Sequence, residues 1–395
     1  MLKNIHIKKF KCLEDENLEL GGLTILAGKN SSGKSTVLQS ILIAARNCNL
    51  KNKERMYGTV SKYQALDFDF ELSNDTTHYT CSNDNFSAMD DETLLFEESL
   101  YYLSSNRFGQ EELAKFSKEY KVGENGEFLL GTYFLMLGSS TNFHITFEDC
   151  KYFFDLCTNK NIIQDITDSM LKTIHVVLKD NKYKPHEKLK NLCKIVYDKE
   201  ARENCPDEMK TLLLHLMTFP VALNCWLSYI TESKNSFLAE VVTSDRCKTF
   251  FHQKEIGDIN PFNVGTGMSF LAKVLILCFL AKPGDVVIIE NPEIHLHPKA
   301  QSRLGEFFSF LASKKIQLII ETHCEHLINS LRYQVYKKRI SKDDIVIHYK
   351  EDENTHFKKI RISDDGYYIN TDGKKIPFPN GFFDVSIQQL MEIGL

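Results

Sequence analysis

The sequence lacks any long, uninterrupted apolar segment. Its longest apolar run, FLAKVLILCFLA (270–281), is too short to span a bilayer and contains a lysine. The N-terminal residues, MLKNIHIKKFKCLEDE, are interrupted by charges where a signal peptide needs an apolar core. We therefore expect a cytoplasmic protein without a membrane partner.

Paired cysteines and an excess of basic residues are also absent. The 11 cysteines include no C-x-x-C pair, which argues against a disulfide framework and against a standard zinc site. The formal net charge is −5, so any binding of nucleic acid requires a local basic patch or a partner. One such patch is RYQVYKKRISK (332–342), for which a solvated helix end is the alternative interpretation.

Strands and helices alternate at both ends of the chain. Apolar strands are predicted at 23–28, 285–290, 316–322 and 344–350, and helices at 34–48, 267–281, 298–313 and 324–338. A hairpin is predicted over 60–82 and a further strand in 100–109. Such alternation predicts an α/β fold with a mixed, mainly parallel sheet.

The middle of the chain has a different character. The segments 111–120 (EELAKFSKEY), 162–180 and 208–230 have helical patterns, separated by breaks that contain Gly and Asn. A chain of 395 residues suits two lobes, or one domain with a large insertion. We expect an N-terminal part over 1–109, a mainly helical insertion over 110–236 and a C-terminal part over 237–395, the two end parts sharing one sheet.

The segment GKNSSGKST (28–36) fits the pattern G-x-x-x-x-G-K-[ST] between an apolar strand and an amphipathic helix, which is the context of a P-loop. The glycines allow a tight turn close to phosphate, the lysine can reach the β- and γ-phosphates, and the following serine can ligate Mg²⁺. The segment therefore predicts a nucleotide and Mg²⁺ as cofactors, and the family resemblance given below implies that the nucleotide is ATP. The predicted ATP-binding residues are Gly28, Lys29, Asn30, Ser31, Ser32, Gly33, Lys34, Ser35 and Thr36.

A second glycine-rich segment, NVGTGMSFLAKVL (263–275), places Ser269 at the start of a predicted helix. The N-terminus of a helix presents unpaired N–H groups, so this segment is a candidate anion site remote in sequence from the P-loop. An ordinary helix cap has a similar composition.

The order of these motifs resembles the ABC-type ATPases of the SMC and RecF kind. Three segments are similar to a prokaryotic branch of AAA-type, ABC-like ATPases: ENPEIHLHPKAQ (290–301), ETHCEHL (321–327) and PFPNGFFDVSIQQLMEIGL (377–395). That branch includes anti-phage defence ATPases of the Septu kind. The resemblance covers both ends of the chain and does not extend to the insertion.

The resemblance implies an ABC-type ATPase head that forms a homodimer or higher homo-oligomer with ATP between two heads. Gly267 and Ser269 would contact the γ-phosphate across the dimer, and His323 would sense it. ATP would favour closure where ADP would not, which makes a switch. The sequence departs from the pattern at Phe270, where the family has Gln or Gly, and at Ser31, where Gly is common.

The strand DVVIIE (285–290) ends in Glu290, Asn291, Pro292 and Glu293. We predict that Glu290 holds Mg²⁺ through water beside Ser35. Asn291 occupies the position where related ATPases have the general base. An amide can orient a water molecule but takes no proton at neutral pH. The sequence therefore predicts slow hydrolysis that uses Glu293 or a water held by Asn291.

Three further residues have open roles. Arg107 in YYLSSNRFGQ resembles a YL-x-x-x-R element of the same branch, and it would either reach phosphate or pin the surrounding lobe. ABC-type ATPases also have a glutamine that couples magnesium to the insertion. Gln64 and Gln110 are both candidates for it.

His295 and His297 are close enough in sequence to suggest a metal site with Glu293 as a third ligand. The resembling family has the same HLHP pattern without metal chemistry. We therefore favour a role in orienting the loop and capping the helix that starts at Pro298.

These features favour an ATPase that controls a separate effector, a nuclease or a toxin, in defence or DNA maintenance. One alternative is a non-hydrolysing ATP-dependent scaffold or clamp. Another is a self-contained nuclease of the overcoming-lysogenization-defect kind, although the segment after ETHCEHL lacks a D-x-D at a strand end. A transporter ATPase fits less well, because no membrane-coupling element is recognisable.

Overall fold

A computed structural model describes residues 1–47, 69–73, 78–82, 86–89, 94–107, 109–117, 121–123, 125–137, 200, 203–207, 210, 214 and 219–379. These residues belong to two compact units. The terminal unit comprises 1–107 and 281–395, and the middle unit comprises 108–280. The middle unit thus includes 237–280 as well as the predicted insertion.

The terminal unit contains a five-stranded antiparallel sheet with the order β2-β1-β4-β5-β6. Its strands are β1 (Asn4–Phe10), β2 (Leu13–Glu19), β4 (Asp69–Ser73), β5 (His78–Ser82) and β6 (Phe86–Met89). Strands β4 and β5 form an antiparallel pair within the hairpin predicted over 60–82, while 60–68 and 74–77 lie outside the described residues.

The second sheet of the terminal unit has seven strands in the order β16-β15-β14-β3-β13-β12-β7. Five are parallel: β3 (Leu23–Gly28), β7 (Leu100–Leu103), β12 (Val286–Glu290), β13 (Gln317–Glu321) and β14 (Ile345–Lys350). At the edge, β15 (Lys358–Ile362) and β16 (Tyr368–Ile369) are antiparallel. The predicted mixed, mainly parallel sheet is confirmed. Strand β13 separates β3 from β12, which determines the layout of the site.

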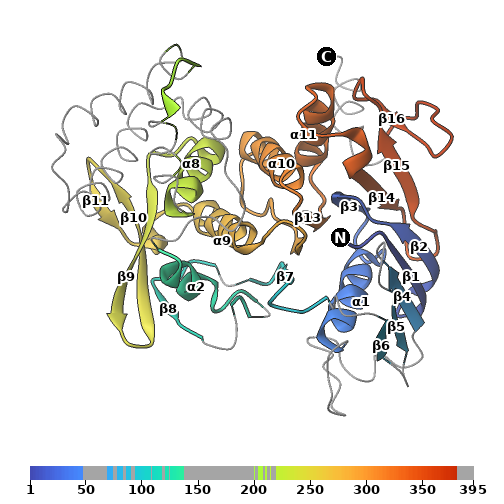
Figure 1. Cartoon of the computed structure of the whole chain (residues 1–395), viewed down its shortest axis with the longest axis horizontal. Helices are drawn as coiled ribbons and strands as arrows, with labels where there is room; N and C mark the ends of the chain where they lie inside the picture. The colour runs from blue at the N-terminus through green and yellow to red at the C-terminus, as the bar shows by residue number, and fades with distance from the viewer. Residues whose placement is uncertain are drawn as a thin grey trace, which may run out of the picture. The chain divides into compact units, whose positions relative to one another are not determined.

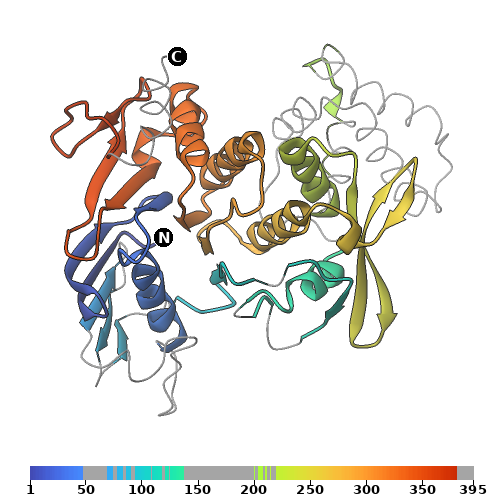
Figure 2. The same ribbon diagram turned by 180° about the vertical axis from the view of Figure 1, so that it is seen from behind.

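Helix α1 (Lys34–Asn47) contributes to a core that it shares with both sheets of the terminal unit. It is buried on nearly all sides, which explains its largely apolar sequence after the P-loop. Helices α10 (Pro298–Ser313) and α11 (Glu325–Tyr336) pack side by side, as Figures 1 and 2 show. A Cβ atom on Gly305 of α10 would lie 2.8 Å from Cβ of Ser330, so the glycine permits this close approach.

The middle unit contains a four-stranded sheet in which β9 and β8 pair with β10, and β10 pairs with β11. Its strands are β8 (Leu113–Lys115), β9 (Ser236–Thr243), β10 (Arg246–Gln253) and β11 (Gly257–Ile259). Its helices are α2 (Leu129–Leu135), α8 (Phe219–Thr231), the 3-10 helix η3 (Pro261–Asn263) and α9 (Thr266–Leu280). Rings of Tyr133, Phe219, Phe237 and Phe279 join α2, α8, β9 and α9 in one aromatic core.

The helix predicted over 111–120 is wrong, because residues 113–115 form strand β8. Leu113, Ala114 and Lys115 pair with β10, and this long-range pairing outweighs the local helical pattern. The predicted helix over 208–230 is confirmed from Phe219 onward as α8. The predicted helix over 162–180 lies outside the described residues.

Among the described residues, no helix combines the length and the apolar character needed to cross a bilayer.

Candidate nucleotide site

The P-loop connects β3 to α1 through a backbone of alternating handedness. The φ angles are 141° at Gly28, 59° at Ser31 and 101° at Gly33. A Cβ atom on Gly28 would lie 2.0 Å from the carbonyl oxygen of Lys350 in β14, so only glycine fits there. A loop of this kind turns successive N–H groups toward one point, where an anion binds.

A pocket of about 310 Å³ opens over this loop. Its volume lies at the lower end of the range for small-molecule sites. The lining residues are Cys12, Asn30, Ser31, Ser32, Gly33, Lys34, Ser35, Thr36, Asn291, Glu321 and His323. The structure therefore brings the P-loop together with two of the four residues predicted to be catalytic, Asn291 and His323.

The Lys34 side chain is held at the P-loop itself. Its ammonium donates hydrogen bonds to the carbonyl oxygens of Gly28 at 3.2 Å and Lys29 at 2.6 Å. Burial lowers the pKa of Lys34, and the nearby Glu321 carboxylate acts in the opposite direction. The lysine is therefore positioned and desolvated where a polyphosphate would bind.

The carboxylate next to the P-loop serine is Glu321. The Ser35 hydroxyl donates a hydrogen bond of 2.9 Å to Oε1 of Glu321, at the end of β13. Burial raises the pKa of Glu321 to about 7, the Ser35 hydrogen bond lowers it, and the Glu290 and Glu293 carboxylates raise it. The sequence motifs alone did not point to a role for Glu321. The signal that was present is the polar residue that ends an apolar strand, as Glu290 does.

Glu290 ends the neighbouring strand, in register with Glu321. Its Oε1 accepts a hydrogen bond from the Tyr102 hydroxyl at 2.9 Å. Its Oε2 accepts from the backbone N–H and the hydroxyl of Ser105 at 3.1 and 3.0 Å. Glu290 is thus fixed at the carboxyl edge of the sheet, but it does not line the pocket, and its predicted link to Mg²⁺ through water stays a prediction.

Asn291 lines the pocket in a left-handed conformation, with φ of 43°. Its backbone N–H donates to the carbonyl oxygen of Glu321 at 2.8 Å. Its side-chain oxygen is buried and has no hydrogen-bond partner among the described residues. A buried amide oxygen without a partner is costly, and it marks a position where a ligand or water would be bound.

Arg107 holds the backbone on both sides of this turn. Its guanidinium donates to the carbonyl oxygens of Glu290 at 3.0 Å and Asn291 at 3.1 Å. Burial lowers its pKa to about 10, and the nearby Glu293 and Glu290 carboxylates act in the opposite direction. Of the two roles predicted for Arg107, pinning the structure is the one that these contacts support.

Glu293 lies beneath the same edge and does not line the pocket. Its Oε1 accepts hydrogen bonds from the Thr322 hydroxyl at 2.7 Å and from the N–H of His323 at 3.1 Å. Burial raises its pKa. Glu293 therefore fixes the backbone that carries His323, whose imidazole pKa is lowered by burial and by Lys34.

His297 caps α10, because its Nδ1 accepts a hydrogen bond from the N–H of Lys299 at 3.4 Å. This hydrogen bond supports the capping role that the sequence favoured. Among the described residues, no group of three or more His, Cys, Asp or Glu side chains is arranged to hold a metal ion.

The second glycine-rich segment lies in the middle unit, where Gly267 and Ser269 occupy the first turn of α9. The Ser269 hydroxyl is buried and has no hydrogen-bond partner among the described residues. Gln110 donates a hydrogen bond of 2.8 Å to the Val264 carbonyl oxygen, just before this turn. Gln64, the other candidate coupling glutamine, lies outside the described residues.

The profile of the AAA ATPase domain family matches residues 1–328 of this chain. The chain belongs to this family. It is a P-loop ATPase, and the resemblance to AAA-type ATPases stated from the motifs is confirmed. The matched range includes the P-loop and the ETHCEHL segment.

A 41-residue segment is 51% identical to the OLD nuclease of Thermus scotoductus (strain ATCC 700910 / SA-01). That match covers 10% of this ATPase and 8% of the nuclease.

Solved structures similar to this ATPase include heads of SMC proteins. The SMC head bound to the C-winged helix domain of ScpA has a TM-score of 0.43 at 12% identity, covering 92% of this chain and 97% of that one. The SMC head domain from Thermotoga maritima has a TM-score of 0.39 at 9% identity, covering 92% and 99%. The SMC head domain with an extended coiled coil, bound to the C-terminal domain of ScpA derived from Pyrococcus furiosus, has a TM-score of 0.45 at 12% identity, covering 99% of each chain.

Proposed function

We propose that this chain is a slow ATPase that acts as a nucleotide-driven dimerisation switch in the cytoplasm of a prokaryote. In this proposal two copies close around ATP, and the closed form controls a separate effector, a nuclease or a toxin, in defence or DNA maintenance. Membership of the ATPase family supports the binding of ATP. The backbone turn after β12 supports a slow rate of hydrolysis.

The main support for slow hydrolysis is the identity of the residue that follows β12 and lines the pocket. Asn291 lines the pocket, whereas Glu290 and Glu293 are held by hydrogen bonds to other groups. An amide can orient a water molecule but cannot accept its proton at neutral pH. We therefore assign the positioning of water to Asn291 and a structural role to Glu293.

The residues at the pocket fit Mg²⁺ and ATP. The buried Ser32 hydroxyl and Oε2 of Glu321 have no hydrogen-bond partner among the described residues, although both residues line the pocket. We propose that Ser35 and Glu321 hold Mg²⁺, with Glu290 acting through water, and that Lys34 and the P-loop N–H groups bind the phosphates. Bound Mg²⁺ would neutralise charge on the β- and γ-phosphates.

The dimer is supported by the start of α9. Ser269 has a buried hydroxyl without a described partner, and the backbone before it is open at Gly265, where a Cβ atom would meet no atom within 4 Å. The helix is firmly held, because the buried ammonium of Lys273 forms an ion pair with the partly exposed Glu111. We propose that this turn binds the γ-phosphate of ATP held by a second copy.

Phosphate release by the purified chain tests the slow rate. We expect turnover below about 1 s⁻¹, which is the low end for enzymes. Asn291→Glu should raise the rate by about tenfold or more, because it supplies a base. Glu293→Gln should stay within about twofold of the wild-type rate, since Gln still accepts a hydrogen bond from Thr322.

Two further variants test the binding of Mg²⁺ and ATP. Glu321→Gln should weaken the dependence of the rate on Mg²⁺, and Lys34→Ala should abolish ATP binding.

Light scattering with ATP or ADP tests the switch. Wild type should be a dimer with ATP and should dissociate with ADP, while Ser269→Arg should bind ATP and remain monomeric. The same oligomeric state in all nucleotides would contradict the switch. Bound ATP without any turnover would favour the non-hydrolysing scaffold instead.

The segment similar to the OLD nuclease favours a nuclease as the second candidate function. This candidate predicts metal-dependent DNA cleavage by the pure chain. Cleavage that persists in a carefully purified sample would overturn the proposal of a separate effector.

A further inference from the structure

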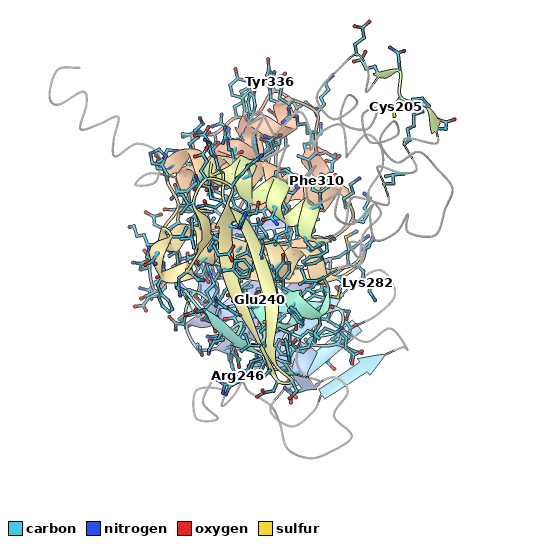
Figure 3. The ribbon with its side chains drawn as sticks, turned by 90° about the vertical axis from the view of Figure 1, so that its left-hand side faces the viewer. Cys205, Glu240, Arg246, Lys282, Phe310 and Tyr336 are labelled. Carbon is cyan, nitrogen blue, oxygen red and sulfur yellow. The ribbon has the colours of Figure 1, made fainter. Side chains whose placement is uncertain are left out.

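Three exposed tyrosines lie on one surface of the terminal unit. Tyr333 and Tyr336 on the last turns of α11 are 52% and 54% exposed, and Tyr367 between β15 and β16 is 47% exposed. Arg332 joins the two segments, because its Nε donates to the Gly366 carbonyl oxygen at 2.7 Å. Tyr336, labelled in Figure 3, projects outward from the ribbon. Exposed aromatic rings that gather on one surface make it a candidate for binding.

Lysines from two segments accompany these rings. The ammonium of Lys337 lies 5.4 and 5.8 Å from the ring centroids of Tyr333 and Tyr336, and that of Lys375 lies 3.5 Å from the ring of Tyr367. We call these five residues the tyrosine–lysine surface. Each ring thus has a cation at one face, while about half of its side chain stays open to solvent.

The charge around this surface favours an anionic partner. The segment 332–342 contains five basic residues and no carboxylate, and one of the five, Arg339, pairs with Glu306. Lys338 and Lys374 are exposed and have no ion pair among the described residues. Of the carboxylates on the facing turns, Asp364 pairs with Lys342, which leaves Asp365 and Asp372.

An ordinary helix end does not account for the whole arrangement. Cations at the C-terminus of α11 are favourable in any helix, which explains Lys337 and Lys338. It does not explain exposed tyrosines, nor Lys375, which comes from another segment. Proteins that bind single strands combine these two features, cations for the phosphates and aromatic rings for the bases.

We propose that the tyrosine–lysine surface binds single-stranded nucleic acid, with bases stacked on the tyrosine rings and phosphates held by the lysines. A duplex keeps its bases paired and cannot stack them on a protein surface. An acidic peptide would bind the lysines but has no bases to stack on the exposed tyrosine rings. The chemistry is shared by DNA and RNA, which differ by the 2′-hydroxyl. This inference is independent of the switch proposed above.

Fluorescence anisotropy of the full chain without nucleotide tests the proposal. The probes are labelled oligo(dT), oligo(rU) and a DNA duplex of equal length. Tyr333→Ala combined with Tyr336→Ala should weaken binding of a single strand by about tenfold per ring, and the matched pair of Phe variants should retain it. Replacing Lys337 and Lys375 by Gln should lower the salt dependence by about 0.7 per lysine.

The control is Phe262→Ala, which removes an exposed aromatic ring from the middle unit and should leave binding unchanged. Thermal unfolding of each variant verifies that it folds. The proposal is overturned if the Ala pair binds a single strand as wild type does, or if the duplex binds more tightly. It is also overturned if a poly-glutamate peptide competes as well as unlabelled oligo(dT).

Discussion

At the scale of one residue, the backbone conformation at position 291 favours asparagine over most other residues. Its φ of 43° is costly for most residues and tolerable for asparagine, whose short amide adapts to the left-handed region. Arg107 and the Glu321 carbonyl hold this conformation in place. A glutamate at this position would gain a base but would lose about 1 kcal/mol of stability to strain. The slow hydrolysis that we propose would then have two causes: the Asn291 amide is no base, and the left-handed backbone at this position disfavours a glutamate.

His348 in β14 makes a residue-scale prediction about pH. Its Nε2 lies 2.7 Å from the Glu19 carbonyl oxygen, and burial lowers its pKa to about 4. The folded-state pKa is below the ordinary value of about 6.5, so the neutral form stabilises the fold above pH 6.5. This contribution, about 3 kcal/mol at most, is lost as the pH falls from about 6.5 through 4.

His348→Gln isolates this effect, because the amide can still donate to Glu19 but does not titrate. The measurement is the free energy of unfolding in urea at pH 7.5, 5.5 and 4.5. Wild type should lose more stability than the variant between the first and last pH. Parallel losses would show that His348 does not titrate in this range, because the carboxylates that also titrate there are common to both proteins.

At the scale of elements, the sequence predicted the strands around the site but not their order. Periodicity and apolar runs identify β3, β12, β13 and β14 within one or two residues. Which strands are neighbours depends on long-range pairing, and no local pattern encodes it. Because β13 lies between β3 and β12, its terminal Glu321 reaches Ser35, and Glu290 on β12 does not. The P-loop, Asn291 and His323 were therefore predictable, while the partner of Ser35 was not.

The packing of α10 against α11 makes a prediction at the same scale. Gly305→Ala should destabilise the protein by about 1–3 kcal/mol, although alanine is the better helix former. The added Cβ would lie 2.8 Å from Ser330 Cβ and 2.9 Å from the Leu327 carbonyl oxygen, so the helices must separate. Unfolding in urea measures the change. Ser313→Ala, at an exposed position of α10, is the control and should change stability by less than about 0.5 kcal/mol. Equal effects of both variants would contradict this account.

At the scale of the whole molecule, the division into two units predicts how ATP affects unfolding. The pocket residues all belong to the terminal unit. In calorimetry of the Ser269→Arg variant, in which ATP would not contact a second copy, we expect two transitions, of which Mg²⁺ and ATP at about 100 times the Kd raise one by about 5–10 °C. Lys34→Ala should remove the shift, and proteolysis with and without ATP should identify the stabilised unit as the terminal one. A single transition that shifts as a whole would show that the units unfold together.

The position of β14 has a consequence for how little of this protein can fold by itself. This strand lies at residues 345–350, beyond the portion that the family profile matches, yet it pairs with β3 along its whole length. Its Lys350 accepts a hydrogen bond from the P-loop N–H of Lys29, and its ammonium forms a buried ion pair with Glu16. A fragment ending at residue 328 would contain every motif of the nucleotide pocket and would still expose an apolar strand edge beside it, with Glu16 buried and unpaired. The portion that the family profile matches therefore ends before the strand that completes the sheet beside the pocket.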